Sequence, residues 1–389
     1  MYKSSANNLL YLSGAPRVST HKDSLAYGPR NHVLGVMQGF ESLGWGVDSY
    51  IAGDEFSGYF ANKQYQDFSK NNPLKIFGID LARMAINHMN QYKVKKRFKY
   101  HYECIYERYG LFQALGAQFR KKSAWIIETN EVYFKEAAAD RQSLKLQKMA
   151  KKHEATVYHN CDLVVTITQS LKDLLVEEFD IFKDKILVLP NAFSEKELLS
   201  QQLEKESHSF NILFVGLVTE WIGLQTLIQA MSRVDLPINL HIVGDGPYKE
   251  HLIKIANELS VIDKIQFHGF ISRPEIFDYF DGADIGYSGH IPLTTERYHS
   301  PMKLYEYMGR GLPVISSDDE DSRVMLNNGA YGFIFERGDP EDLSRVLISA
   351  YSQRERWNSM GWGARKFITE NHLWKHRVET LLEYLESMA

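Results

Sequence analysis

Residues 300–315 read Ser-Pro-Met-Lys-Leu-Tyr-Glu-Tyr-Met-Gly-Arg-Gly-Leu-Pro-Val-Ile. Ser300 is a suitable N-cap and Pro301 a suitable first helical residue, so the stretch predicts a helix that begins here. We expect Gly311 to end that helix and Pro313 to introduce a short buried strand at 314–317. A helix followed at once by an apolar strand is one step of a doubly wound α/β sheet.

The same alternation of short apolar runs and longer helix-like stretches extends over both halves of the chain. The predicted strands cover residues 9–12, 47–51, 125–128, 163–168 and 186–189, and then 212–215, 238–243, 265–268, 285–288 and 314–317. Because continuous apolar runs are typical of strands buried on both faces, each half is predicted to hold a parallel sheet between helices. The predicted fold class is therefore α/β, with two Rossmann-like doubly wound domains.

The length of 389 residues also favours two domains. We place an N-terminal domain at 1–190 and a C-terminal domain at 207–370. The polar stretch 190–209 has no strand character and is predicted to link them. The last segment, 371–389, has leucines at helical spacing and is expected to pack back on the first domain. Ligands of such sheets bind at the carboxyl ends of the strands, so two facing domains would share a cleft there.

The composition indicates an ordinary folded protein, with 44% hydrophobic and 24% charged residues. Two cysteines make no disulfide framework, and no apolar run reaches the roughly 20 residues of a membrane helix. We therefore expect a cytoplasmic protein with no export signal. The net charge of −4 and the lack of a recognisable nucleic-acid-binding module argue against nucleic acid as a partner.

The charge is divided unequally between the two halves. Residues 1–190 carry 26 Lys and Arg against 20 Asp and Glu, a net charge of +6, whereas the remainder carries 19 against 29, a net charge of −10. A basic first half can approach an anionic acceptor, or make peripheral contact with the anionic inner face of a membrane. Charges scattered by chance over a solvated surface explain the numbers equally well.

Glycines at the ends of predicted strands indicate a phosphate-binding edge in the second half. Gly216 follows the strand 212–215, and Gly244 and Gly246 follow the strand 238–243. Glycine lets the backbone approach a phosphate closely, although a turn glycine with no ligand is the commoner explanation of any single one. The third glycine of the dinucleotide fingerprint is absent.

The helix predicted at Ser300 adds positive charge to this edge. Its N-terminus is the positive end of the helix dipole, and Lys303 in the first turn adds a full charge, so a diphosphate fits there. Glu306 lies one turn further on, where its carboxylate can accept hydrogen bonds from the hydroxyls of a ribose. The alternative is that Lys303 and Glu306 form an exposed ion pair with no ligand.

Together these residues resemble the donor-site segment of the family 4 retaining glycosyltransferases (glycosyl transferases group 1), in the subgroup that reads S-P-x-K-L-x-E-Y-M. Further segments resemble this family in the expected order, at residues 106–112, 128–131, 161–166, 189–192, 214–216 and 243–247. The resemblance implies the GT-B fold, in which two such domains face each other across a cleft. It also implies a set of donor-binding residues, namely Gly216, Leu217, Trp221, Gly244, Gly246, Phe270, Ser300, Pro301, Met302, Lys303 and Glu306.

The chain departs from the family pattern at three positions. Many members have an Arg where Leu217 stands and a Lys where Ile222 stands, and both clamp the diphosphate. The loop with Trp221 resembles a tryptophan-containing variant, so Lys303 and the helix N-terminus are expected to carry more of the phosphate charge. Tyr298 replaces the first glutamate of the family's E-x7-E motif, which leaves only the second, ribose-binding glutamate.

The resemblance implies a retaining reaction in which the acceptor attacks from the face that the diphosphate leaves. Such a reaction needs both substrates held in place and the growing charge on the diphosphate stabilised. Lys303 is the expected catalytic residue, together with Asn130 and Glu131, which follow the strand 125–128 and can touch the sugar or the acceptor. Asn130 and Glu131 can equally cap the next helix.

The region after the first predicted strand faces the same cleft by topology. We interpret four of its residues as an acceptor or phosphate loop: Gly14, Arg17, Gly28 and Arg30. The sequence Asp319-Glu320-Asp321 matches the D-x-D pattern that holds a metal in other glycosyltransferases, but its acidic setting indicates a solvated surface loop. No cofactor and no bound metal are therefore expected.

The expected donor is a nucleotide-sugar, with a UDP-hexose such as UDP-glucose favoured, and the expected acceptor is a glycan, exopolysaccharide or lipid-linked glycan. Two alternatives remain open. One is a sugar-nucleotide epimerase of the same fold, which would need paired acid and base carboxylates around the sugar. The other is a non-catalytic nucleotide-sugar-binding protein, for which the missing Arg, Lys and Glu argue.

Overall fold

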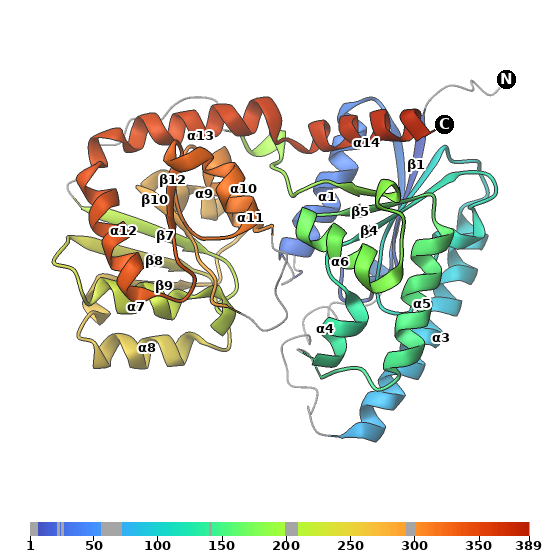
Figure 1. The fold of residues 1–389 in the computed structure, drawn as a ribbon, viewed down its shortest axis with the longest axis horizontal. Coiled ribbons are helices and arrows are strands. Elements are labelled where there is room, and N and C mark those ends of the chain that lie inside the picture. Colours follow the sequence, from blue (N-terminus) through green and yellow to red (C-terminus); the bar gives the residue numbers. More distant parts are fainter. Residues whose placement is uncertain are drawn as a thin grey trace. The chain divides into compact units, whose positions relative to one another are not determined.

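The computed structural model describes residues 7–21, 24, 27–55, 72–139, 142–198, 209–292 and 300–388. The chain folds into two compact units (Figure 1). The first unit consists of Met1–Pro190 with Trp374–Ala389, and the second of Asn191–Leu373. Each unit has one six-stranded sheet, and the strand pairs of both sheets are parallel. The predicted α/β class with two parallel sheets is confirmed.

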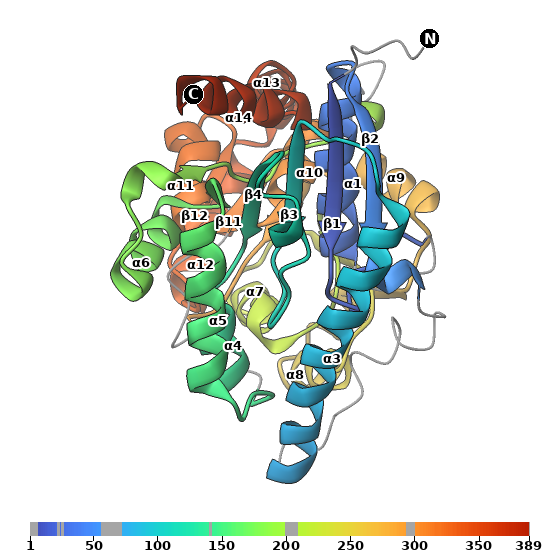
Figure 2. The same ribbon diagram turned by 90° about the vertical axis from the view of Figure 1, so that its right-hand side faces the viewer.

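The sheet of the first unit has the strand order β2-β1-β3-β4-β5-β6. Its strands are β1 (Asn8–Ser13), β2 (Gly46–Ile51), β3 (Cys104–Arg108), β4 (Ala124–Thr129), β5 (Leu163–Thr166) and β6 (Ile186–Val188). The α-helices of this unit are α1 (Tyr27–Ser42), α3 (Pro73–Arg97), α4 (Tyr133–Ala139), α5 (Gln147–Asn160), α6 (Gln169–Phe179) and α14 (Trp374–Met388), and its 3-10 helices are η1 (Ala52–Glu55), η3 (Gly116–Gln118) and η4 (Lys183–Lys185). Figure 2 shows β1, β3 and β4 side by side, with α3 extending beyond the ends of the strands.

The C-terminal helix α14 belongs to the first unit and packs against α1. The ring of Trp374 lies edge-on to that of His32, with ring centroids 4.9 Å apart. Two glycines of α1 make room for this contact, since a Cβ on Gly35 would lie 2.1 Å from the Trp374 ring and one on Gly39 would lie 2.7 Å from the Trp374 carbonyl oxygen. A larger side chain at either glycine would therefore push α14 away from α1.

The sheet of the second unit has the strand order β12-β11-β10-β7-β8-β9. Its strands are β7 (Phe210–Val215), β8 (Ile238–Val243), β9 (Ile265–Gly269), β10 (Ile285–Ser288), β11 (Val314–Ser317) and β12 (Gly332–Phe335). The α-helices are α7 (Leu224–Met231), α8 (Lys249–Glu258), α9 (Arg273–Gly282), α10 (Met302–Gly309), α11 (Glu320–Met325), α12 (Pro340–Ser352) and α13 (Trp357–Asn371). The 3-10 helices are η5 (Glu195–Glu197), η6 (Glu220–Ile222), η7 (Ile262–Lys264), η8 (Asn327–Gly329) and η9 (Arg354–Arg356).

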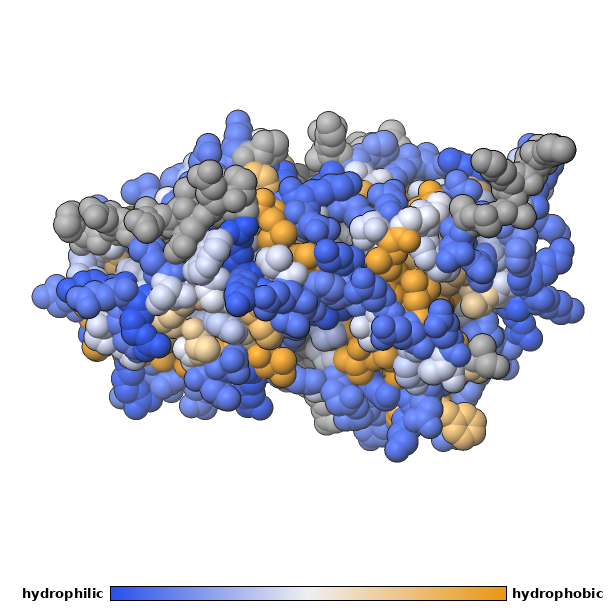
Figure 3. Space-filling model, turned by 90° about the horizontal axis from the view of Figure 1, so that it is seen from above, coloured by the Kyte–Doolittle hydropathy of each residue, from blue (hydrophilic) through white to orange (hydrophobic). Residues whose placement is uncertain are grey.

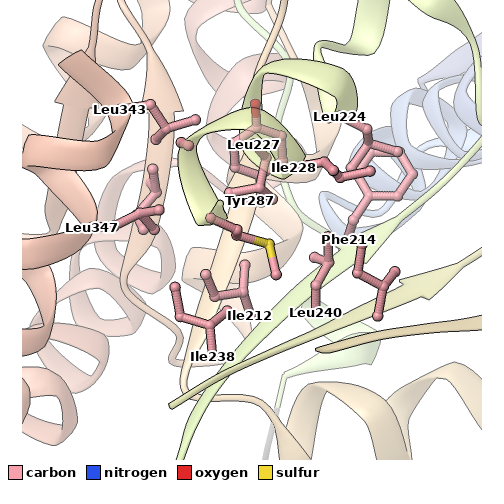
Figure 4. Close-up of a cluster of buried hydrophobic side chains, with 14 of the residues drawn as sticks. Ile212, Phe214, Leu224, Leu227, Ile228, Ile238, Leu240, Tyr287, Leu343 and Leu347 are labelled. Carbon is pink, nitrogen blue, oxygen red and sulfur yellow. The ribbon is translucent and has the colours of Figure 1, made fainter. Parts of the chain in front are cut away.

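Helices cover both faces of the second sheet, which is why most residues of its central strands β7 and β8 are apolar. On one face α7, α8 and α12 bury a cluster of aliphatic side chains, in which Leu227 and Leu343 lie over Ile212 of β7 (Figure 4). On the other face α9, α10 and α13 pack on the alternate strand residues, such as Leu213. Leu227 and Leu343 have no exposed surface, so replacing either with Ala would cost about 2–5 kcal/mol of stability.

The ten predicted strands are present, but the prediction missed β3 and β12. The strand β3 contains Glu107 and Arg108, which interrupt the apolar pattern although both are buried. Glu107 accepts hydrogen bonds from two backbone N–H groups, at 2.7 Å each, and from the indole of Trp125 at 3.0 Å. Burial raises the pKa of Glu107 to about 7. The strand β12 begins with Gly332 and is only four residues long.

The surface seen in Figure 3 is mostly hydrophilic, with smaller apolar areas among the polar side chains. Within the described parts of the chain, no helix has the length and hydropathy that a membrane span requires.

Candidate functional site

Three strand ends of the second sheet bring glycines together. Gly216 follows β7, Gly244 follows β8 and Gly269 ends β9. The N–H of Gly216 donates to the carbonyl of Val243 at 2.9 Å, and that of Gly244 donates to the carbonyl of Gly269 at 2.7 Å. Gly244 has a φ of 140°, and a Cβ on it would lie 1.9 Å from the Gly216 carbonyl oxygen. Only glycine fits there, because the backbones of the two strand ends pack directly against each other.

Lys303 lies against this glycine edge. It is the second residue of α10, and its side chain is partly buried, with Nζ 5.3 Å from the centroid of the Phe214 ring. A Cβ on Gly216 would lie 2.9 Å from Cε of Lys303 and 3.4 Å from its Nζ. Burial lowers the pKa of Lys303 to about 8, against the opposing effect of the Glu306 carboxylate. An ammonium group and the positive end of a helix thus meet at the glycine edge, which suits an anionic ligand.

Glu306 lies one turn after Lys303 on α10 and forms an ion pair with Arg273, whose Nη2 is 2.9 Å from the Glu306 Oε1. Arg273 is the first residue of α9. Its guanidinium also binds Glu197, with Nε 3.1 Å from Oε1 and Nη2 2.5 Å from Oε2. Burial alone would lower the pKa of Arg273, but the two carboxylates raise it above its ordinary value. The sequence analysis did not identify Arg273 or Glu197.

Ser300 does not cap α10, which begins at Met302 with Pro301 in the N-cap position. The Ser300 hydroxyl donates to the Oδ2 of Asp321 at 2.7 Å and accepts from the backbone N–H of Asn191 at 3.2 Å. The side-chain amide of Asn191 donates to the Ser300 carbonyl at 2.6 Å. The predicted cap is therefore wrong, because the Asp321 carboxylate takes the Ser300 hydroxyl and fixes the chain just before α10.

The two aspartates of the D-x-D pattern are not in a solvated loop. Asp319 is the N-cap of α11 and accepts from the Ser322 N–H at 2.8 Å, and it is only 4% exposed. Asp321 is 6% exposed and accepts from the Tyr305 hydroxyl at 2.8 and 2.9 Å as well as from Ser300. The surface interpretation is wrong because these carboxylates satisfy buried donors of α10 and α11. In the parts of the chain that the structure describes, no three or more His, Cys, Asp or Glu residues are grouped as a metal site would require.

Trp221 and Leu217 lie in the segment between β7 and α7. Trp221 is in η6 and is 38% exposed, and its ring stacks on that of His290 with centroids 5.7 Å apart and an interplanar angle of 13°. The N–H of Ile291 donates to the Trp221 carbonyl at 3.1 Å, so this segment is held next to the end of β10. Leu217 is partly buried and follows Gly216 directly.

The other predicted donor residues follow β8 and β9 or begin α10. A Cβ on Gly246 would lie 2.2 Å from the Val218 carbonyl oxygen, so close approach of the backbone requires glycine here too. Phe270 follows β9 and is 53% exposed, and Met302 at the start of α10 is partly buried. Tyr298, the position of the missing first glutamate, lies outside the described residues.

Asn130 and Glu131 follow β4 in the first unit. Asn130 donates through Nδ2 to Glu128 at 3.3 Å, and Glu131 forms an ion pair with Arg17 at 3.5 Å. Two backbone N–H groups at the start of α4 donate to the Glu154 carboxylate, both at 3.0 Å. The start of α4 is thus bound by a buried glutamate from α5.

Glu128, which the sequence analysis did not single out, is the centre of a buried polar cluster at the end of β4. It lies 2.8 Å from His32 Nε2 and accepts from the Tyr106 hydroxyl at 2.8 Å and from Arg108 Nη1 at 2.9 Å. Burial alone would raise the pKa of Glu128, but His32, Arg108 and Tyr106 lower it to about 2. A cavity of about 20 Å³, enough for one water, adjoins the cluster and reaches Trp374.

Gly14 and Arg17 lie in the loop after β1, whereas Gly28 and Arg30 lie at the start of α1. Arg17 is exposed, and its ion pair connects this loop to the end of β4. Arg30 donates through Nε to the carbonyl of Thr20 at 3.1 Å, which fixes the far end of the same loop. Among the described residues, no atom lies within 4 Å of the place where a Cβ on Gly28 would stand, so these neighbours do not require glycine.

The predicted residues thus fall into two groups, one in each unit. Gly216, Gly244, Lys303 and Glu306 gather in the second unit, and Arg17, Asn130 and Glu131 gather in the first. The sequence analysis missed the polar partners that hold these groups: Asn191, Glu197, Arg273, Glu128 and His32. The sequence did contain a signal for the position of Arg273. The capping box at 272–275 marks the start of a helix directly after the strand 265–268, and Arg273 is the first residue of that helix.

Comparison with known proteins connects the second unit to one family. Residues 195–367 match the family model of glycosyl transferases group 1. Chitobiosyldiphosphodolichol beta-mannosyltransferase of Debaryomyces hansenii is 24% identical over 305 residues, which cover 68% of this chain and 64% of that protein. The chain spans about 60% of the length of the curated relatives that it matches.

Solved structures resemble the chain over both units. Sucrose-phosphate synthase of Thermosynechococcus elongatus has a TM-score of 0.73 and 17% identity, over 98% of this chain and 100% of that chain. HepE of Anabaena, solved in complex with UDP, has a TM-score of 0.60 and 14% identity, again over 98% of this chain and 100% of that chain. These likenesses show the fold, and the predicted GT-B-like architecture of two parallel sheets with helices is confirmed.

Proposed function

We propose that the protein is a retaining glycosyltransferase of the glycosyl transferases group 1 family, whose model residues 195–367 match. It moves a hexose from a nucleotide-sugar to a glycan, exopolysaccharide or lipid-linked acceptor. The C-terminal domain holds the donor, and the N-terminal domain holds the acceptor. The observation that carries this proposal is the Lys303 ammonium, which lies beside the bare backbone of Gly216 at the start of α10.

The donor-site geometry is suited to the departure of a nucleoside diphosphate. The diphosphate lies on the glycine edge, where Lys303 and the N-terminus of α10 stabilise the negative charge that grows as the sugar leaves. Glu306 accepts hydrogen bonds from the ribose hydroxyls. Because the family's Arg and Lys clamps are replaced by Leu217 and Ile222, Lys303 carries a larger share of that charge than in most members.

Asn130 and Glu131 complete the proposed catalytic group, together with the loop that contains Arg17. The Arg17–Glu131 ion pair connects the loop after β1, which we propose as the acceptor loop, to the segment that follows β4, so this contact holds the two segments together. Their role is to hold the transferred sugar and the acceptor hydroxyl in reactive geometry rather than to remove a proton. We assign them to acceptor positioning.

The choice of UDP over other nucleotides is supported by HepE of Anabaena, which was solved with UDP. A lipid-linked acceptor is supported by the name of the Debaryomyces hansenii relative, whose acceptor is a dolichol diphosphate glycan. The basic balance of residues 1–190 would favour such an anionic acceptor.

A thermal-shift panel of UDP-, GDP- and ADP-glucose tests this proposal. A ligand at 100 times its dissociation constant stabilises the protein by about 2.7 kcal/mol, so the correct nucleotide should raise the melting temperature clearly above the other two. No shift with any nucleotide-sugar would contradict the proposed donor site. Incubation with the selected donor alone then separates the alternatives. An epimerase converts the sugar without an acceptor, a binding protein leaves the donor intact, and a glycosyltransferase hydrolyses it slowly.

A further inference from the structure

We propose that Arg273, anchored by Glu197, is a positioning residue that holds Glu306 in the orientation needed to bind the donor ribose. This inference rests on the proposed function, because it takes Glu306 as the ribose-binding group. It adds two residues, from segments far apart in the sequence, to the donor site.

The ion pair between Arg273 and Glu306 fixes one carboxylate oxygen. Nη2 of Arg273 is 2.9 Å from the Oε1 of Glu306, and the two side chains are 20% and 13% exposed. A glutamate side chain otherwise loses rotamer entropy when a ligand immobilises it. Because Arg273 holds Glu306 before the donor arrives, the site is preorganised and binding avoids much of that loss.

Arg273 is itself held firmly enough to act as a support. Its Nε and Nη2 bind the two carboxylate oxygens of Glu197, at 3.1 and 2.5 Å, and its guanidinium lies 5.7 Å from the centroid of the Phe277 ring. This two-point contact uses the planar fork of arginine, which lysine cannot reproduce. The position of Glu306 therefore depends on a guanidinium rather than on positive charge alone.

Glu197 is a fixed anchor because its backbone is also bound. It ends η5, in the stretch by which the chain enters the second unit, and its carbonyl accepts from Nη1 of Arg310 at 3.3 Å. Arg310 is 8% exposed and pairs with Asp281 of α9 at 2.8 Å. Two arginines, Arg273 and Arg310, thus bind the side chain and the backbone of Glu197.

The arrangement distinguishes a positioning role from direct ligand binding. Nε and Nη2 of Arg273 are directed at Glu197 and Glu306, so Arg273 acts on the ribose through the Glu306 carboxylate. Loss of Arg273 should then weaken the contacts that Glu306 makes with the two ribose hydroxyls. Contacts with the diphosphate, which belong to Lys303 and the glycine edge, should be unaffected.

Calorimetric titration of the full chain with UDP and with 2′,3′-dideoxy-UDP tests this prediction. We expect Arg273→Ala to weaken UDP binding by about tenfold, the lower end of the loss seen when a supporting partner of a ligand-binding side chain is removed. Binding of 2′,3′-dideoxy-UDP should change little, because it has no hydroxyls for Glu306 to bind. Arg273→Lys should resemble Arg273→Ala if the fork is required, and Glu197→Gln should weaken UDP binding in the same direction.

A double-mutant cycle completes the test. In a Glu306→Gln background, Arg273→Ala should cause little further loss of UDP affinity, because Arg273 acts through Glu306. Arg345→Ala is the matched control, since Arg345 is an exposed arginine in an ion pair with Asp342 of the same unit, and it should leave affinity for UDP unchanged. If the panel selects GDP or ADP, the same nucleotide and its dideoxy form replace UDP.

Two outcomes would overturn the inference. Equal losses for UDP and its dideoxy form would mean that Arg273 binds the ligand elsewhere or only supports the fold. Full affinity in a folded Arg273→Ala variant would mean that Glu306 needs no support. If instead the parent protein binds no nucleoside diphosphate, the proposed function itself fails, so the two failures are distinguishable.

Discussion

Lys303 holds an ammonium group in surroundings that penalise its charge. Its side chain lies over the Phe214 ring, and burial lowers its pKa to about 8. A diphosphate bound at the same edge would raise the pKa of Lys303 again, because its negative charge favours the protonated amine. The side chain is thus arranged for the bound state rather than for the free one.

Replacing Lys303 with Ala and Glu306 with Gln should affect different kinetic constants. In the proposed site Lys303 would face the charge that grows as the diphosphate leaves, so its loss should fall mainly on kcat, by about 10²- to 10³-fold or about 2.7–4 kcal/mol. In the proposed site Glu306 would bind the ribose before and during the reaction, so Glu306→Gln should weaken donor affinity together with rate. Steady-state kinetics with varied donor measures both. If both variants are folded and keep the parental rate and donor affinity, the assignment of this donor site is wrong.

The depressed pKa of Lys303 predicts how donor binding changes with pH. Below pH 8 the amine is protonated in the free protein, and the diphosphate finds a full positive charge. As pH rises through about 8 the free protein loses this proton, while the complex retains it, so affinity for UDP should fall by up to about tenfold per pH unit. Titration calorimetry from pH 7 to 9.5 measures the change. A Lys303→Met variant should bind weakly and show no such slope, and an equal slope in that variant would refute the assignment.

At the scale of elements, the start of α10 depends on α11 and on the stretch that enters the second unit. Asp321 of α11 accepts hydrogen bonds from Ser300 and Tyr305, and Asn191 binds Ser300 from the other side. The position of Lys303 therefore rests on contacts between three segments. Asp319, as the N-cap of α11, orients the helix that carries Asp321.

This arrangement predicts that activity does not require a metal at the D-x-D pattern. Asp321 accepts from two buried hydroxyls and Asp319 caps α11 through Oδ1, so we assign both a structural role and expect sugar transfer to survive prolonged treatment with EDTA. Asp321→Asn should instead lower stability by about 1–3 kcal/mol, because buried hydroxyls of Ser300 and Tyr305 lose a carboxylate acceptor. Activity assays and thermal unfolding measure the two effects separately. Loss of transfer in EDTA with recovery in Mg²⁺ or Mn²⁺ would contradict this interpretation.

At the scale of the whole molecule, the excess of positive charge in residues 1–190 has a partial local explanation. Several basic residues lie at the end of α3 and just beyond it, and others lie after η3: Lys93, Lys95, Lys96, Arg97, Lys99, Arg120, Lys121 and Lys122. Lys93 and Arg97 pair with Glu55, at 3.6 and 3.3 Å, which reduces the net charge of this face. Exposed Lys95 and Lys96 remain available to an anionic surface.

We therefore expect weak, salt-sensitive binding to vesicles that contain anionic lipid. Each basic side chain near such a surface contributes about 1 kcal/mol, so replacing Lys95 and Lys96 with Gln should weaken binding by roughly 30-fold. Replacing two exposed lysines of the second unit, Lys254 and Lys366, removes the same charge and serves as the control. Co-sedimentation at low and high salt measures the difference. Equal binding of both double variants would show that the face around α3 has no special role.

The sequence by itself determined the class of fold and the backbone of the candidate donor site. Apolar runs predicted ten of the twelve strands found in the described residues, because burial on both faces of a parallel sheet leaves a pattern that depends only on neighbours in the chain. Gly216, Gly244 and Lys303 followed from the same local rules, since strand ends and helix starts are marked by residues next to them. The strands that contain Glu107 or begin with Gly332 were missed because these residues interrupt that local pattern.

Only the tertiary structure decided which polar side chains support the site. Arg273 meets Glu306 and Glu197 across 33 and 76 residues, and Asn191 meets Ser300 across 109 residues. The same is true of Asp321, which looks like a surface acid in the sequence and is a buried acceptor in the fold. A buried charge is costly unless it has a partner. Here the tertiary fold brings that partner from a distant part of the sequence, so no local pattern could have revealed it.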